Sequence, residues 1–346
     1  GNFGNTTFTE TRSTMARVVA VACPKGGVGK TTVSVNLGAA LASKGFSTLI
    51  LGVDPQCGLA SSFGRDPLSI DRGLPEFFEP EGRVDLSVQP TGIGNLDFVS
   101  SNVWSWDEED QLLGWAAINP ESLREKLLAL KEGYDFCLLD CPPNLGPLTV
   151  AALQSADTLL VPLQAEELAY RSLPRLFDAL AGLEQQGFSV PELEGVLLNQ
   201  VDLRTRMSNS VLQRAQEDFP GKVFRTLIPR SIRLAEVAQR GKPVMSFNRS
   251  GGAAQAFLQV ADEILDHILA EKDEGQEEHR AEVPGVGDAL PADIEALLAG
   301  EENPDESGEG EVLLSLEEIP ESEQESCQVS RPSLDDYEGS EETPWH

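Results

Sequence analysis

One short stretch decides the fold: Lys25-Gly26-Gly27-Val28-Gly29-Lys30-Thr31-Thr32. It follows an apolar run at residues 18–23 and precedes a helical pattern at residues 31–44. Glycines let successive backbone N–H groups turn inward as a nest for phosphate oxygens, and a helix N-terminus adds a partial positive charge. In such a turn Lys30 reaches the terminal phosphates of a nucleotide, and the Thr31 hydroxyl ligates Mg²⁺. The stretch therefore predicts a nucleotide site between a buried strand and a helix.

The same alternation of strand and helix continues along the chain. Apolar runs predict further buried strands at residues 47–53, 136–139, 158–163 and 195–198. Helical patterns lie at residues 121–131, 173–185 and 253–270. The prediction is an α/β fold with a mainly parallel, twisted sheet flanked by helices.

Composition divides the chain into three parts. Residues 1–15 are polar and predict a disordered lead-in, and residues 16–270 form the nucleotide-binding domain. Residues 271–346 hold 25 acidic and 3 basic residues, out of 57 acidic and 26 basic in the whole chain. Such a tail cannot bury enough apolar area to order itself, so we expect it to be disordered. Its apolar islands at residues 294–298 and 312–319 are either chance or short motifs that fold on a partner.

The segment at residues 66–120 shows a less regular pattern than the rest. It holds Trp104, Trp106 and Trp115 beside an acidic cluster at residues 107–110. We expect a surface insertion pinned by its aromatic side chains, with a partner-docking surface as the alternative.

Histidine and cysteine usage excludes several classes of protein. The three histidines, His267, His279 and His346, lie at or beyond the end of the predicted domain, which disfavours triad hydrolases and histidine-based zinc sites. The five cysteines include no C-x-x-C pair, which is typical of a reducing cytoplasm. No apolar run approaches the roughly 18 residues needed to span a bilayer, and the first 15 residues show no secretory pattern.

The phosphate stretch departs from the common G-x-x-x-x-G-K-T pattern in an informative way. Position 24 is Pro24 instead of glycine, and a second lysine, Lys25, stands five residues before Lys30. This resembles the deviant Walker A motif of the ParA/MinD family of P-loop ATPases. The resemblance implies that Gly26, Gly27, Val28, Gly29, Lys30, Thr31 and Thr32 bind ATP or ADP. It also implies that Lys25 reaches across an ATP-dependent homodimer to the partner's phosphates, as an arginine finger does.

Two further motifs match the family in order. Asp54-Pro55-Gln56 resembles its switch I, so Asp54 is expected to orient the attacking water and help hold Mg²⁺. Asp140 ends an apolar strand in a Walker B-like motif, where a contact with Mg²⁺ would offset the cost of its burial. Gly52 and Gly58 stand where the family usually has aspartate and asparagine, which bears on the hydrolysis rate.

The resemblance covers about residues 16–270 and favours the ParA side, through Asp54-Pro55-Gln56 and Ile228-Pro229-Arg230. It places Asn199 and Pro229 near the nucleotide base, although Asn199 could equally end a strand and cap the next loop. Residues 201–250 hold ten basic and four acidic residues, and ParA-like proteins bind DNA non-specifically through this part of the chain. The expected DNA-binding residues are Arg204, Arg206, Arg225, Arg230, Arg233 and Lys242.

The prediction is a cytoplasmic, nucleoid-associated ATPase that segregates DNA or positions a cargo. A ParB-like or cargo adaptor protein with a short basic segment would stimulate its hydrolysis, and the acidic tail disfavours membrane binding. One alternative is a slowly or non-hydrolysing nucleotide-dependent scaffold that recruits partners through its tail. Another, a metal-cluster carrier, is disfavoured because paired cysteine ligands are missing.

Overall fold

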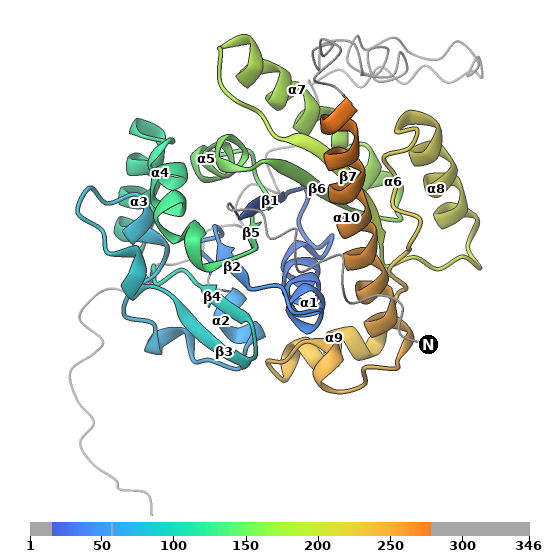
Figure 1. Ribbon diagram of the computed structural model, residues 1–346, viewed down its shortest axis with the longest axis horizontal. Coiled ribbons are helices and arrows are strands. Elements are labelled where there is room, and N and C mark those ends of the chain that lie inside the picture. Colours follow the sequence, from blue (N-terminus) through green and yellow to red (C-terminus); the bar gives the residue numbers. More distant parts are fainter. Residues whose placement is uncertain (1–15, 57, 278–346) are drawn as a thin grey trace, which may run out of the picture. The chain divides into compact units, whose positions relative to one another are not determined.

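The computed structural model describes residues 16–56 and 58–277. Its sheet has seven strands in the order β3-β4-β2-β5-β1-β6-β7 (Figure 1). The strands are β1 (Arg17–Val21), β2 (Thr48–Gly52), β3 (Gln89–Ile93), β4 (Leu96–Val99), β5 (Phe136–Asp140), β6 (Thr158–Gln164) and β7 (Glu192–Asn199). Every neighbouring pair is parallel except β3 and β4, so the predicted mainly parallel sheet is confirmed.

Ten α-helices are assigned in the described part of the chain. They are α1 (Lys30–Ser43), α2 (Gly58–Ser62), α3 (Trp106–Ile118), α4 (Ser122–Leu130), α5 (Pro147–Ser155), α6 (Glu167–Tyr170), α7 (Leu173–Gln185), α8 (Arg206–Asp218), α9 (Ile232–Gln239) and α10 (Gly252–Glu277). The predicted helices at residues 31–44, 121–131 and 173–185 correspond to α1, α4 and α7.

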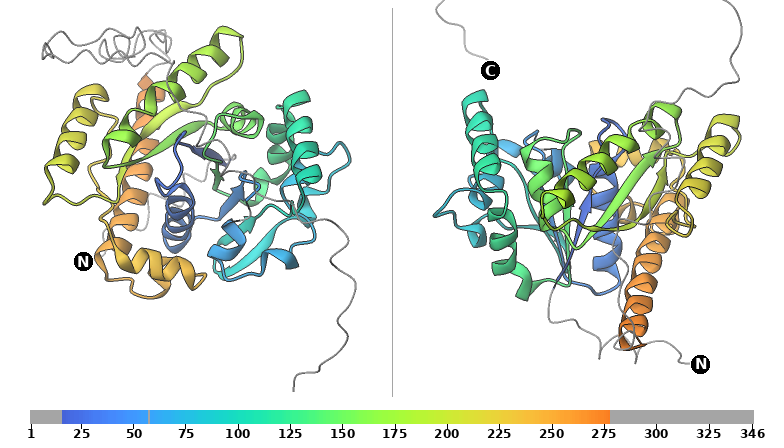
Figure 2. Two further views of the ribbon diagram at one scale, coloured as in Figure 1. Left: turned by 180° about the vertical axis from the view of Figure 1, so that it is seen from behind. Right: turned by 90° about the horizontal axis from the view of Figure 1, so that it is seen from above.

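The alternation of side chains along β1 explains why helices cover both faces of the sheet. Val18 and Ala20 enter one apolar cluster, with side chains from α3, α4, α5, α7 and α8. Val19 and Val21 enter the other, with side chains from α1, α2 and α10. Figure 2 shows these helix layers on the two sides of the sheet. Because both faces are buried, the strands are nearly continuous in apolar residues, which is why they were visible in the sequence.

The structure corrects the expectation that residues 66–120 are a surface insertion. β4 pairs in parallel with β2 inside the main sheet, and Phe98 of β4 and Leu112 of α3 are fully buried. The pattern was hard to recognise because β3 is an edge strand without a buried residue and β4 is only four residues long. Trp104 and Trp106 nevertheless remain 47% and 84% exposed.

Helix α10 extends beyond the expected domain boundary at residue 270. It continues to Glu277, and Glu271 pairs with Arg17 of β1 at 2.6 Å. Arg17 also pairs with the buried Glu194 of β7 at 3.0 Å, so α10 is tied to the sheet at this end. The predictions for residues 1–15 and 278–346, and for the two apolar islands, lie outside the described residues. Among residues 16–56 and 58–277, no helix is long and apolar enough to cross a membrane.

Candidate functional site

The phosphate stretch forms the loop between β1 and α1, as the sequence predicts. Gly27 and Gly29 have φ angles of +80° and +91°, in the left-handed region that favours glycine. Lys30 is the first residue of α1 and is buried, and its Nζ donates to the backbone carbonyl of Lys25 at 3.0 Å. The first turn of α1 contains no acidic side chain that would repel an anion. The loop thus combines a helix N-terminus, an ammonium group and glycines in the left-handed conformation, which suits a polyphosphate.

The order of the strands brings Thr31, Asp54 and Asp140 to one place. Asp140 ends β5, which lies between β1 and β2, and its Oδ2 accepts a hydrogen bond from Thr31 Oγ1 at 2.7 Å. Ser34 Oγ donates to the other carboxylate oxygen at 3.3 Å. Burial raises the pKa of Asp140 to about 7, and the nearby charge of Asp54 also raises it, while the Thr31 hydrogen bond lowers it.

This donor set fits a hard divalent cation. A carboxylate buried beside a second carboxylate is unfavourable unless a cation or a proton compensates the charge. Hydroxyl and carboxylate oxygens are the ligands that Mg²⁺ prefers. Thr31, Asp54 and Asp140 would therefore hold Mg²⁺, which would supply charge neutralisation at the phosphates.

Asp54 lies two residues after the end of β2, on the loop that leads to α2. It is half-buried, and its Oδ1 accepts a hydrogen bond from the backbone N–H of Gln56 at 3.0 Å. This hydrogen bond shapes the turn at Asp54-Pro55-Gln56 and leaves the carboxylate on the same strand edge as Asp140.

The structure gives a physical reason for Gly52. A Cβ at this position would lie 3.2 Å from Leu59 Cδ2 and 3.4 Å from the backbone carbonyl of Val99. Leu59 of α2 thus packs over Gly52 and fills the space that a side chain would need.

Asn199 lies against the phosphate loop. Its Nδ2 donates to the carbonyl of Val28 at 2.7 Å, and its Oδ1 accepts from the N–H of Gln200. A Cβ on Gly29 would approach Nδ2 to 2.4 Å, so the loop and the amide are closely fitted. The nearby Pro229 forms a bridge with Val201.

Gln200 was missed from the sequence. Its Nε2 donates to the carbonyl of Gly27 at 3.0 Å, and its own φ is +56°. Together with Asn199 it holds two consecutive carbonyls of the phosphate loop, which leaves the N–H groups free to face a ligand. A glutamine after a strand carries no recognisable signal for this contact, because the partner lies 173 residues away.

The six predicted DNA-binding residues fall into two groups. Arg204 makes a two-point contact with Asp202, at 2.7 and 2.6 Å, and Arg225 lies 3.5 Å from Glu263 of α10. Arg206, Arg230, Arg233 and Lys242 are exposed, and within the described residues none of them is in an ion pair. Sequence alone could not reveal the pairing of Arg225, because its acidic partners lie on α10, whereas the partner of Arg204 is only two residues away.

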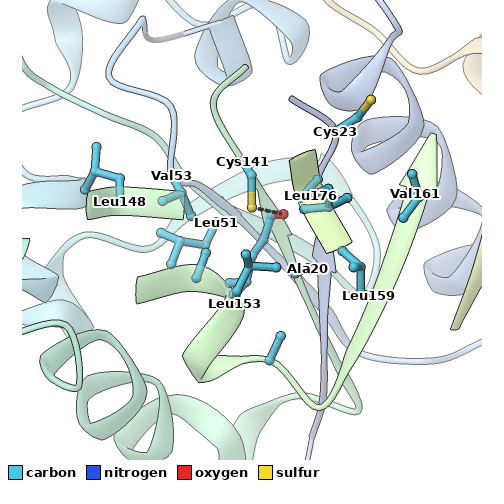
Figure 3. Packing of buried hydrophobic residues seen from close by; sticks show 14 of the residues in the cluster. Ala20, Cys23, Leu51, Val53, Cys141, Leu148, Leu153, Leu159, Val161 and Leu176 are labelled. Carbon is cyan, nitrogen blue, oxygen red and sulfur yellow. Dashed lines mark hydrogen bonds between the residues drawn. The ribbon is translucent and has the colours of Figure 1, made fainter. Parts of the chain in front are cut away.

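The cysteines of the described part lie in the core. Cys23, Cys137 and Cys141 are buried, and Figure 3 shows Cys23 and Cys141 among the apolar side chains of one cluster. Burial raises the pKa of the Cys23 thiol. Within residues 16–56 and 58–277, no group of three or more His, Cys, Asp or Glu side chains is placed to hold a metal ion.

Comparisons with known proteins agree with this geometry. A family model described as an AAA domain (AAA_31) matches residues 16–193. The sporulation initiation inhibitor protein Soj of Bacillus subtilis (strain 168) is 33% identical over 251 residues, which are 72% of this chain and 98% of that relative. The chromosome partitioning protein ParA of Caulobacter vibrioides (strain NA1000 / CB15N) is 34% identical over 251 residues, 72% of this chain and 94% of its own.

A solved structure supports the same assignment. Cobyrinic acid a,c-diamide synthase from Mycobacterium smegmatis, with bound ADP and magnesium, superposes with a TM-score of 0.63 and 29% identity over 74% of this chain and 97% of its own. The residues matched by the family model span the phosphate loop, Asp54 and Asp140. The chain belongs to the ParA/MinD family of P-loop ATPases, on the side of Soj and ParA.

Proposed function

We propose that the protein is an ATP-dependent dimerising ATPase that binds DNA without sequence preference and segregates DNA or positions a cargo. ATP or ADP with Mg²⁺ is the ligand of its phosphate loop, in keeping with the family and with the oxygen donors at Thr31, Asp54 and Asp140. Lys25, whose carbonyl receives Lys30 Nζ, would present its ammonium group to the nucleotide of a second copy. Closure of the dimer would then depend on ATP.

The observation that carries the DNA-binding proposal is the charge around α9. Residues 230–249 contain five basic side chains and only one acidic side chain, Glu236. Arg230, Arg233, Arg240, Lys242 and Arg249 are all exposed, and none has an ion-pair partner among the described residues. In a chain of net charge −31, such a surface is best explained by an anionic partner.

Arg204, Arg225 and Arg206 have a smaller role in this proposal. Arg204 and Arg225 already form ion pairs with acidic side chains of the same chain. Arg206 lies at the start of α8 rather than on α9.

The test is binding to a duplex of random sequence across a salt series with Mg²⁺ and ATP. Arg233→Ala should weaken binding and reduce the slope of log affinity against log salt by about 1. Arg175→Ala is the charge-matched control, since Arg175 is also exposed but lies on α7. If both variants bind as the wild type does, the α9 surface is not the DNA-binding face.

The cellular setting follows from this proposal. A partner protein with a short basic segment would stimulate hydrolysis and release the DNA, in the cytoplasm at the nucleoid. The alternative of a slowly hydrolysing scaffold is favoured by one observation, the packing of Leu59 over Gly52. An ATP turnover that stays negligible with DNA and the partner protein present would support the scaffold alternative.

A further inference from the structure

The helices α2 and α9 meet at their C-terminal caps. Gly64 follows α2 with φ +66°, and Gly241 follows α9 with φ +64°. A Cβ on Gly241 would lie 2.3 Å from both the Cα and the N of Gly64, and a Cβ on Gly64 would lie 3.2 Å from the carbonyl of Gly241. The two backbones are therefore in direct contact, without side chains between them that could absorb a displacement.

This contact joins two functional parts of the chain. Leu59 of α2 packs against Gly52, which ends β2 two residues before Asp54, the proposed Mg²⁺ ligand. Gly241 lies between Arg240 and Lys242, both exposed cations of the α9 surface. A change at the carboxyl end of β2 can thus reach the proposed DNA-binding face through α2.

A second contact attaches the same segment to the phosphate-loop helix. The N–H of Val244 donates to Asn36 Oδ1 at 2.8 Å, and Asn36 Nδ2 donates to the carbonyl of Thr32 at 2.8 Å. Asn36 is buried in α1, so Val244 is a fixed point relative to the phosphate loop. Gly241, three residues earlier, is instead held by α2.

The space between these helices is nearly filled. A hollow of only about 20 Å³ lies between α1, α2 and α9, and its lining includes Val35, Ser62 and Leu234. Because so little space separates these helices, a shift of α2 should be transmitted to α9 rather than absorbed between them.

We propose that Gly241 is a positioning residue, which through its contact with Gly64 makes the orientation of the α9 cations depend on the nucleotide bound at Asp54 and the phosphate loop. The inference rests on the proposed DNA binding by α9. It adds the route by which the nucleotide controls that binding.

The test compares the ratio of DNA affinities with Mg-ATP and with Mg-ADP, using the full chain and a duplex of random sequence. Gly241→Ala should lower this ratio by about tenfold and leave ATP affinity unchanged. Gly64→Ala, with its milder clash, should lower it less. Gly187→Ala is the matched control, since Gly187 ends α7 with φ +83° and has nothing within 4 Å of its Cβ position.

A second readout needs no DNA. Amide hydrogen exchange over residues 232–246 should differ between the ADP and ATP states of the wild type, and this difference should vanish in Gly241→Ala and shrink in Gly64→Ala. Equal exchange in the two states of the wild type would overturn the inference, as would a folded Gly241→Ala or Gly64→Ala protein with the wild-type ratio. A wild type that binds no DNA but shows the exchange difference would overturn the proposed function and leave the coupling intact.

Discussion

Asn199 Nδ2 donates to the backbone carbonyl of Val28 at 2.7 Å, across 171 residues of sequence. The end of β7 therefore supports the loop that begins after β1. Asn199 is almost completely buried, so its contribution to the site is the shape of the phosphate loop, in addition to any contact with the nucleotide base.

Asn199→Ala removes the donor and leaves the Val28 carbonyl without this hydrogen bond. We expect the free energy of unfolding to fall by about 1–3 kcal/mol, and ATP binding to weaken because the loop is less well ordered. Asn209→Ala is the control, since Asn209 is exposed and bonds the carbonyl of Leu203 at 3.0 Å. Calorimetry and denaturant titration measure both quantities. Equal effects of the two substitutions would contradict the role given to Asn199.

The buried carboxyl group of Asp140 should make the free energy of unfolding depend on pH when Mg²⁺ is chelated. Burial raises the pKa of Asp140 in the folded protein to about 7, whereas an unfolded chain has an aspartate pKa of about 3.9. Between these values the folded state binds the extra proton, so the free energy of unfolding falls as the pH rises. The Asp140→Asn variant has no titrating group at this position. Its free energy of unfolding should therefore fall less than that of the wild type between pH 5 and pH 8.

Denaturant unfolding in EDTA, repeated at several pH values, checks this prediction. The exposed Asp107→Asn serves as the control and should follow the wild type. Parallel curves for the wild type and Asp140→Asn would show that the buried carboxylate is compensated in some other way. Added Mg²⁺ should stabilise the wild type and have little effect on Asp140→Asn.

Gly52 and Leu59 should behave as a coupled pair. Gly52→Asp places a side chain against Leu59 Cδ2, where a Cβ already lies at 3.2 Å, and we expect a loss of about 1–3 kcal/mol from this overpacking. In the background of Leu59→Ala the same substitution should cost less, because the nearest contact, Leu59 Cδ2, is removed. A double-mutant cycle measures the coupling, and strictly additive losses would contradict it.

The same variants address the scaffold alternative. ATP turnover of the Gly52→Asp, Leu59→Ala protein can be compared with that of Leu59→Ala alone. A faster turnover in the double variant would show that the missing carboxylate limits hydrolysis. Equal turnover rates of the two variants would show that hydrolysis needs no carboxylate at position 52 in addition to Asp54 and Asp140.

Local patterns predicted the parts of the site that are contiguous in sequence. The glycine-rich stretch identified the phosphate loop, and Asp54 and Asp140 could be placed because each lies at or just after the carboxyl end of an apolar strand, at the same edge of the sheet. The sheet class followed from the same strands, since burial on both faces makes them continuously apolar.

Contacts between distant segments could not be predicted. Gln200 and Gly27 come together only because β7 and β1 lie in the same sheet with β6 between them. Gly64 and Gly241 each resemble an ordinary helix-ending glycine, and their contact depends on how α2 and α9 are packed. Strand β4 was missed because four residues beside a glycine-rich turn carry too weak a pattern.

In the proposed function, ATP closes a dimer through Lys25, and only this dimer binds DNA. The most direct measurement is sedimentation of the wild type and Lys25→Ala with a labelled duplex, in Mg-ATP and in Mg-ADP. We expect the wild type to form a DNA-bound dimer in Mg-ATP but not in Mg-ADP, and we expect Lys25→Ala to bind ATP but to stay a monomer without bound DNA. A wild-type monomer that binds DNA equally in both nucleotides would contradict it.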